Sequence, residues 1–228
     1  MLRYIISICF FIAGISITAQ ETKKEKDTVP YKDRYGIRVG LDVVLPFYTL
    51  FSDDKKGFEL VGDFRLTNRI YLASELGYRD YTEQEDYYNY STKGQYIKLG
   101  ADYNAYKNWI GMENMIVVGF RYAFSTFDQT LNQYTINADP LLPIRTETEP
   151  INYDNLNAQW LELVLGLKAE VLHNVFLGVS FRGNVMISST EPDNFMNLYV
   201  PGFGEVSFNN MGFSFNYTLS YLIPIYRK

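Results

Sequence analysis

The 228-residue sequence has one cysteine, one histidine and, after its first twenty residues, no long uninterrupted apolar run. The cysteine, Cys9, lies in the apolar N-terminal stretch, so the remainder of the chain cannot form disulfides. The lack of long apolar runs excludes a membrane protein built from helices, because each helical span needs about 20 mostly apolar residues. Acidic residues (26) outnumber basic ones (21), which argues against nucleic acid as a partner.

The first twenty residues have the three parts of a secretory signal peptide. Arg3 is basic, residues 4–17 are apolar, and small residues including Ala19 precede Gln20. Residues 21–34 are charged, contain Pro30 and are predicted to form a flexible lead-in. We therefore expect residues 1–20 to be removed on export and residues 35–228 to form the folded domain.

What the sequence does contain is an alternation of apolar and polar residues, most clearly at residues 159–187, where Trp160 and Val164 are exceptions. A period of two indicates strands, and the short interruption at residues 172–174 indicates an antiparallel hairpin. If Val171 pairs with Val175, the apolar rows of both strands lie on one face. Each strand would then have about the 9–11 residues that a tilted strand needs to cross a bilayer.

The same alternation recurs in eight segments. We predict strands at residues 35–47, 58–66, 70–79, 95–104, 115–127, 159–171, 175–187 and 211–223. The connections after the second and sixth strands are short, whereas those after the first, third, fifth and seventh are longer. This asymmetry is typical of outer-membrane barrels, which have short periplasmic turns and long extracellular loops.

Alternation alone leaves open which row faces the interior. A soluble lipocalin-like barrel would place the apolar row inside, but roughly thirty-five to forty large apolar side chains would overfill an eight-stranded interior. Glycines also concentrate on the charged row, where they would make room for long charged side chains. We therefore predict that the charged row faces inward.

The predicted interior carries seven basic and seven acidic side chains. They are Arg38, Asp42, Glu59, Asp63, Arg65, Glu75, Arg79, Lys98, Asp102, Arg121, Glu162, Lys168, Glu170 and Arg182. An unpaired ion removed from water costs several kcal/mol, so equal numbers of opposite charges suit a sealed interior. We interpret this set as a charge-paired plug and not as a conducting pore.

With these features the chain resembles the small eight-stranded outer-membrane barrels of the OmpA/OmpX-like type. More narrowly, it is similar to an uncharacterised family of bacterial outer-membrane barrels classed as a domain of unknown function. The likeness covers residues 35–226 and implies an all-β fold, an eight-stranded antiparallel up-and-down transmembrane β-barrel in the bacterial outer membrane. One departure is that Tyr226 is followed by Arg227 and Lys228, whereas such barrels often end on an aromatic residue.

Little in the sequence indicates catalysis. Similar folds that modify lipid A imply a histidine with a Ser or Asp partner near the membrane surface, but the one histidine, His173, falls in a turn assigned to the periplasmic side. We therefore predict a protein that is not an enzyme and has no cofactor and no metal site. A lipid-modifying enzyme and, less favoured, a narrow channel remain the alternatives.

The long loops are the candidate working surface of the predicted barrel. The predicted loop at residues 80–94 carries Tyr81, Tyr87, Tyr88 and Tyr90 among acidic residues, and tyrosine supplies rigid amphipathic contact area. We expect a monomer surrounded by outer-membrane lipid and lipopolysaccharide, with a structural or binding role toward an extracellular protein or glycan. Acidic loop groups are also candidates to bind Ca²⁺ or Mg²⁺ between lipopolysaccharide phosphates; a merely solvated loop is the simpler interpretation.

Overall fold

The computed structural model describes residues 33–51, 54–108, 112–136, 145–193, 195–207 and 209–227. All of them belong to one compact unit, Lys32–Lys228. The predicted signal peptide, at residues 1–20, and nearly all of the predicted lead-in lie outside the described residues.

Eight long strands make up most of this unit. They are β1 (Arg34–Asp42), β2 (Lys55–Arg65), β3 (Ile70–Gln84), β4 (Tyr88–Asn104), β5 (Met115–Ile136), β7 (Ile151–Leu172), β8 (Val175–Ser189) and β11 (Met211–Arg227). The short elements are the helix α2 (Val44–Phe51) and the strands β6 (Arg145–Glu147), β9 (Tyr199–Val200) and β10 (Gly204–Glu205).

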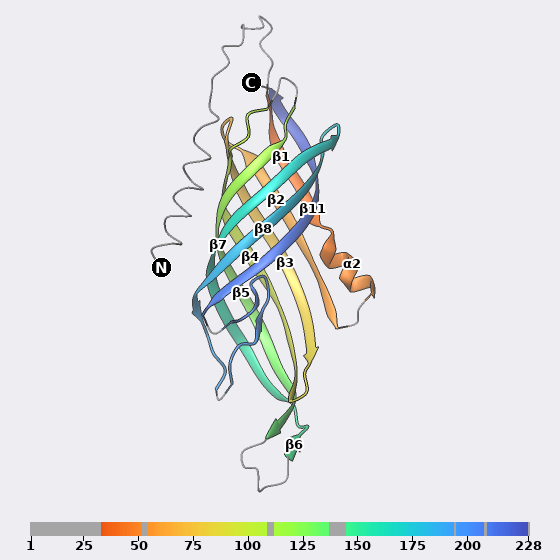
Figure 1. Ribbon diagram of the computed structural model, residues 1–228, viewed down its shortest axis with the longest axis vertical. Helices are drawn as coiled ribbons and strands as arrows, with labels where there is room; N and C mark the ends of the chain where they lie inside the picture. Colours follow the sequence, from red (N-terminus) through yellow and green to blue (C-terminus); the bar gives the residue numbers. More distant parts are fainter. Residues whose placement is uncertain are drawn as a thin grey trace, which may run out of the picture. The chain divides into compact units, whose positions relative to one another are not determined.

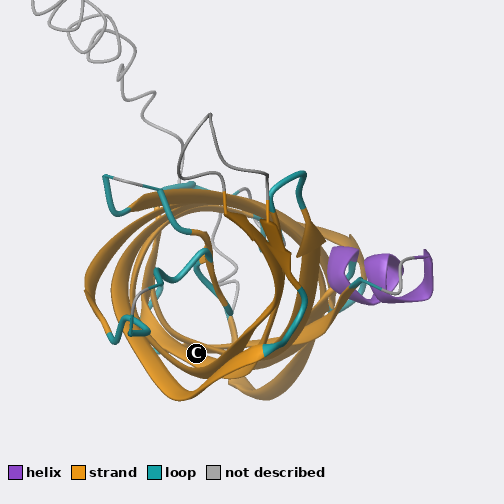
Figure 2. Ribbon diagram, turned by 90° about the horizontal axis from the view of Figure 1, so that it is seen from below, coloured by secondary structure: helices purple, strands orange, loops and turns teal. Residues whose placement is uncertain are grey.

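The long strands close into a ring (Figure 1). One antiparallel sheet of nine strands has the order β4-β3-β2-β1-β11-β8-β7-β5-β6, and the additional pairing of β4 with β5 joins its ends. Among the described strands of this sheet, β6 alone lies outside the ring, paired with the far end of β5. Figure 2 looks along the ring, with α2 outside it. The predicted all-β antiparallel arrangement of eight strands is therefore confirmed.

The first predicted strand, at residues 35–47, is wrong in its second half. The strand ends at Asp42, and α2 replaces residues 44–47. The Oδ1 atom of Asp42 accepts hydrogen bonds from the backbone N–H groups of Val44 (2.8 Å) and Leu45 (3.3 Å), which otherwise lack a partner at a helix start. Pro46, in the first turn, needs no backbone donor there.

Two predicted loops are largely strand, which corrects the loop assignments at residues 80–94 and 128–157. The β3–β4 hairpin stays paired as far as Gln84 and Asn89, and β5 pairs with β7 out to Leu131 and Ile151. These segments are polar but rich in Tyr and Thr, which favour strands. The four strands consequently continue beyond the rest of the ring (Figure 1).

The β7–β8 turn differs from the predicted one in detail. The predicted register holds as far as the pair Glu170 and Phe176. A bulge follows, so Val175 pairs with Leu172 and not, as predicted, with Val171. Asn174 has a φ of 65°, in the left-handed region that Asn tolerates better than most residues. The turn therefore has two residues outside the strands instead of three.

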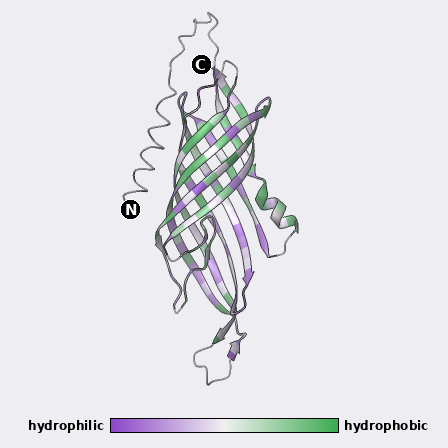
Figure 3. Cartoon of the chain, in the orientation of Figure 1, coloured by the Kyte–Doolittle hydropathy of each residue, from purple (hydrophilic) through white to green (hydrophobic). Residues whose placement is uncertain are grey.

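The two faces of the ring wall have the opposite polarity to those of most water-soluble proteins. Apolar side chains such as Leu72, Leu163 and Phe213 are at least half exposed, whereas charged side chains such as Lys98 and Glu162 are buried. Figure 3 shows the corresponding alternation along the strands. Among the described residues, no helix is long and apolar enough to cross a membrane.

Candidate functional site

The charged interior of the ring is the candidate site. Side chains of a strand alternate between its faces, so every second residue of the eight strands faces inward. Eleven of the fourteen predicted charged residues are buried: Arg38, Asp42, Glu59, Asp63, Arg65, Glu75, Lys98, Asp102, Arg121, Glu162 and Arg182. The other three, Arg79, Lys168 and Glu170, are partly exposed.

Glu75 lies at the centre of the first cluster and meets three basic groups. Its Oε2 atom is 2.6 Å from Nη1 of Arg182 and 3.8 Å from Nζ of Lys98. Its Oε1 atom is 3.4 Å from Nε of Arg121. The strands β3, β8, β4 and β5 thus place four charges within one contact network, which neutralises the buried carboxylate.

Lys98 extends this cluster toward β7 and β2. Its Nζ atom lies 2.8 Å from Oε1 of Glu162 and 4.0 Å from Oε2 of Glu59. The indole N–H of Trp160 donates to the same Oε1 atom of Glu162 at 2.7 Å. Trp160 broke the alternation in the sequence, and its inward position explains why: it is a fully buried donor to a buried carboxylate.

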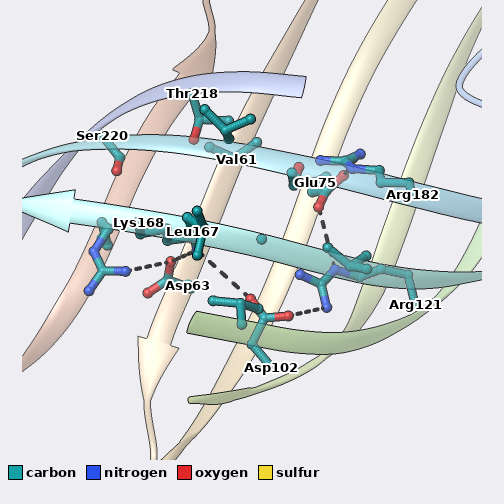
Figure 4. A pocket seen from close by; sticks show the side chains of 16 residues that line it. Val61, Asp63, Glu75, Asp102, Arg121, Leu167, Lys168, Arg182, Thr218 and Ser220 are labelled. Carbon is teal, nitrogen blue, oxygen red and sulfur yellow. Dashed lines mark hydrogen bonds and ion pairs between the residues drawn. The ribbon is translucent and has the colours of Figure 1, made fainter. Parts of the chain in front are cut away.

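A second cluster surrounds Asp63 and Asp102 (Figure 4). Asp63 Oδ2 is 2.7 Å from Lys168 Nζ and 3.2 Å from Arg38 Nη1. Asp102 Oδ1 is 2.7 Å from Arg121 Nη1. Because Arg121 also contacts the carboxylate at the centre of the first cluster, it joins the two clusters into one network.

Glycine makes room for this network at β5. A Cβ atom on Gly119 would lie 2.2 Å from Asp102 Oδ1 and 3.1 Å from Arg121 Nη1. Any side chain at this position would therefore push apart the ion pair between these residues. This contact gives the glycine on the charged row a specific physical role.

A third cluster includes three residues outside the predicted set, Asp33, Arg34 and Glu113. Arg34, assigned to the lead-in, lies 3.1 Å from Glu113 through Nε and 2.6 Å from Glu170 through Nη2. Arg65 contacts Asp33 at 2.9 Å and Glu113 at 3.6 Å. Arg34 lies on the same alternating row of β1 as the inward-facing Arg38, so the alternation in the sequence is a signal for its inward position. Glu113 precedes the first residue of β5, so no alternation indicates where its side chain lies.

Asp42 is held by an amide and by the backbone. Asn216 Nδ2 donates to Asp42 Oδ2 at 2.5 Å and to Glu59 Oε1 at 2.8 Å, and the other oxygen of Asp42 caps α2. The charge-based prediction missed Asn216 because it counted only ionic groups. An inward-facing amide on β11 can bridge two carboxylates by donating both of its hydrogens.

The segment that contains β9 and β10 packs against inward-facing side chains of the ring. Phe203 is buried against Trp160, with ring centroids 5.8 Å apart and planes at 84°, and Asn184 Nδ2 donates to the Phe203 carbonyl at 3.1 Å. Gly202 has a φ of +85°, and a Cβ atom there would lie 2.5 Å from Cγ of Tyr96. We call residues 195–206 the plug segment.

The inward position of the plug segment corrects the prediction of a long loop at residues 188–210. Its signal was the run Pro201-Gly202-Phe203-Gly204, whose second glycine also has a positive φ, of 103°. Tyr199 stacks on Tyr81 with centroids 4.1 Å apart. Burial raises the pKa of Tyr199, so its hydroxyl remains protonated at neutral pH.

A small cavity lies between the first two clusters. This cavity, of about 40 Å³, lies among four basic and three acidic side chains, including Arg38, Asp63 and Lys168 (Figure 4). Since a water molecule needs roughly 10–15 Å³ measured in this way, the cavity has room for only a few waters. The arrangement neutralises buried charge within the ring.

The candidate loop tyrosines take different positions. Tyr81, Tyr88 and Tyr90 lie in paired strands and pack in an aromatic cluster with Leu131 and other residues. Tyr87, in the β3–β4 turn, is 64% exposed. Three of the four side chains thus contribute to packing within the protein, and one is available to a partner.

Two further predicted features can be placed. His173 is exposed in the β7–β8 turn, at the opposite end of β8 from the residues that lead into the plug segment. Within the described ranges, no group of three or more His, Cys, Asp or Glu side chains is arranged to hold a metal ion.

Comparison with known protein families gives a match that covers the full length of the chain. Residues 1–228 match the model of a family described as a domain of unknown function, DUF6048. The chain belongs to this family. The expected membership of an uncharacterised family is thereby confirmed, whereas the likeness to OmpA/OmpX-like barrels stays a prediction. No curated protein matches the sequence.

Proposed function

We propose that this DUF6048 chain is an integral outer-membrane β-barrel of the eight-stranded up-and-down type, similar to the OmpA/OmpX-like barrels. Its role is structural or binding and is exerted through the extracellular end. The observation that carries this proposal is the reversed polarity of the ring wall. Side chains such as Leu72, Phe120 and Phe213 are half exposed or more, while Lys98 and Glu162 are buried.

The energetic argument follows from the area of that apolar surface. Soluble monomers rarely expose contiguous apolar patches larger than a few hundred Å², and each Å² left in water forgoes about 25 cal/mol. Here the exposed apolar rows occur on all eight ring strands. The hydrocarbon core of a bilayer would remove this cost, because the apolar side chains would then contact lipid instead of water. In a closed ring every strand has a partner on both sides, so no strand edge is left unpaired within the bilayer.

The arrangement of the connections supports one orientation. The β2–β3 and β7–β8 turns are short and lie at the end where β1 begins, since Tyr35 Oη donates to Asn68 and Leu222 N donates to the Asn174 carbonyl. The extended β3–β4 and β5–β7 hairpins, α2 and the plug segment lie toward the other end (Figure 1). We assign the short turns to the periplasm and the extended hairpins to the cell exterior.

The ion-paired interior supports a closed barrel over a channel. Three ion-paired clusters and the plug segment lie within the ring, and a cavity among the charged side chains of the first two clusters measures about 40 Å³. An ion crossing this interior would have to break buried pairs such as that between Lys98 and Glu162, 2.8 Å apart. Breaking a buried pair costs roughly 3–5 kcal/mol.

Expression of the full chain in a bacterium with two membranes tests the proposal. We expect the protein in the outer-membrane fraction, resistant to extraction by salt and alkali, with faster electrophoretic migration when it is not boiled. Recovery as a soluble periplasmic protein would overturn the membrane assignment. Planar-bilayer recordings of the purified protein should give no sustained conductance, and steady single-channel currents would overturn the closed interior.

A further inference from the structure

Outward-facing residues of β2, β3, β4 and β5 form successive rungs of cross-strand neighbours. The first rung is Leu60, Leu76, Ile97 and Phe124; the second is Phe58, Tyr78, Gln95 and Thr126; the third is Lys56, Asp80, Lys93 and Asp128. Over four residues of each strand, roughly 13 Å, the outer surface changes from apolar through mixed to charged. This is the gradient of a membrane boundary.

The wall is hollowed where the gradient occurs. The first two rungs line a groove of about 630 Å³, a volume in the roughly 300–1,000 Å³ range of small-molecule sites. Phe58 and Tyr78 stack along one side, with centroids 6.4 Å apart. The surface available in this groove is mostly apolar, and it is continuous with the exposed apolar rows of the wall.

A polar pocket of about 450 Å³ adjoins this groove and shares Tyr78, Gln95 and Thr126 with it. The rest of its lining includes the exposed ammonium of Lys93 and the side chain of Asn155. Asn155 has a φ of 60°, and its backbone N–H donates to Asp128 Oδ1 at 3.0 Å. Asp128 therefore positions the irregular part of β7 that presents Asn155.

We propose that the groove and the adjoining pocket together bind one phosphorylated, acylated glycolipid of the lipid A class. An acyl chain lies along the apolar rungs, and Lys93 binds a phosphate by charge-assisted hydrogen bonds. Gln95, Thr126 and Asn155 offer amide and hydroxyl groups to sugar hydroxyls, in a pocket with more room than a bare phosphate needs. This inference rests on the proposed function, because it takes the groove to face the outer leaflet.

Native mass spectrometry of the full chain in detergent, titrated separately with lipid A and with phosphatidylethanolamine, tests the site. We expect lipid A to bind more tightly. Lys93→Gln should weaken lipid A binding about tenfold, as expected for the loss of one hydrogen bond to a charged group, and Lys107→Gln, at an exposed lysine outside the groove, should not. Equal affinity for both lipids would overturn the glycolipid assignment.

A second variant pair tests the acyl groove. Leu76→Trp fills the groove, whereas Leu72→Trp adds the same bulk to the same face of β3 outside it; the two leucines are 50% and 54% exposed. We expect lipid A affinity to fall only in Leu76→Trp. Equal binding by both variants overturns the site even if the protein fractionates with the outer membrane, whereas a soluble protein would overturn the proposed function itself.

Discussion

Arg182 and Glu75 are 107 positions apart in the chain, yet Nη1 of the arginine lies 2.6 Å from Oε2 of the glutamate in the middle of the ring. Both side chains are buried. Two charges in such a place hold β8 and β3 in a defined relation, because neither can be removed without leaving the other partly uncompensated. The stability of the proposed barrel should therefore depend on individual interior charges.

Arg182→Gln should lower the free energy of unfolding by about 3 kcal/mol, since it leaves carboxylates short of a buried partner. The matched control is Arg145→Gln. Arg145 also pairs with a glutamate, Glu147, but is 76% exposed, so its loss should cost at most about 0.5 kcal/mol. Urea unfolding of both variants in lipid vesicles measures the difference. Equal effects would mean that the interior network does not carry the stability assigned to it.

Introducing a charged residue on the outer face of the ring tests whether that face is surrounded by lipid or by water. Phe120→Lys should destabilise the membrane-inserted protein by about 2–4 kcal/mol if the residue lies near the bilayer midplane. In water the same change at a half-exposed phenylalanine would be nearly neutral. Tyr87→Lys, in the exposed β3–β4 turn, is the control and should have little effect. Unfolding in vesicles and yield in the outer membrane are the measurements, and a neutral Phe120→Lys would contradict the membrane proposal.

The plug segment should be sensitive to a single methyl group. Gly202→Ala introduces a Cβ atom 2.5 Å from Tyr96, at a φ of +85°, and should release the segment. Gly204→Ala shares the positive φ, of +103°, but its Cβ atom would meet nothing within 4 Å. Both changes incur backbone strain of roughly 1 kcal/mol or more, so the steric effect appears as the difference. Limited proteolysis should cleave the segment faster in Gly202→Ala; similar rates would argue against tight packing on Tyr96.

Helix α2 presents apolar side chains outside the ring, with Leu50 and Phe51 78% and 74% exposed. Thr49 ties it to β2 by donating to the Gly57 carbonyl at 3.2 Å. We expect α2 to lie in the membrane interface, as exposed apolar helices adjoining lipid do. The emission that Phe51→Trp adds to that of the two native tryptophans, taken as the difference from the parent chain, should shift to the blue when the unfolded protein is folded into vesicles. The shift should be well beyond that of the emission that Tyr87→Trp adds. Equal emission from the two sites would place α2 in water.

The lone histidine provides a test of the enzyme alternative. His173 is exposed in the turn that we assign to the periplasmic side, far from the extracellular hairpins. We expect His173→Ala to leave the lipid A profile of the host unchanged, as judged by mass spectrometry against wild type and empty vector. A modification that appears with the wild-type protein and disappears with the variant would favour a lipid-modifying enzyme.

The sequence by itself determined the eight strands of the ring, their antiparallel order and which row of residues shares a face. Arg38 and Val39 illustrate why: a period of two is a local property of the backbone, and neighbours in a strand must point to opposite sides. The excess of large apolar residues over the space inside eight strands then indicated which side is inward. In the structure Arg38 is buried and Val39 is exposed.

Only the tertiary structure decided where the strands end and what completes the interior. The polar segments beyond Asp80 and Asp128 remain strands because tyrosines from different parts of the chain pack together, as Tyr81 does on Tyr199. Arg34 meets Glu113 across 79 residues, and Phe203 reaches Trp160 through a segment without alternation. Such contacts depend on the closure of the ring, which brings distant residues together, and no local period encodes them.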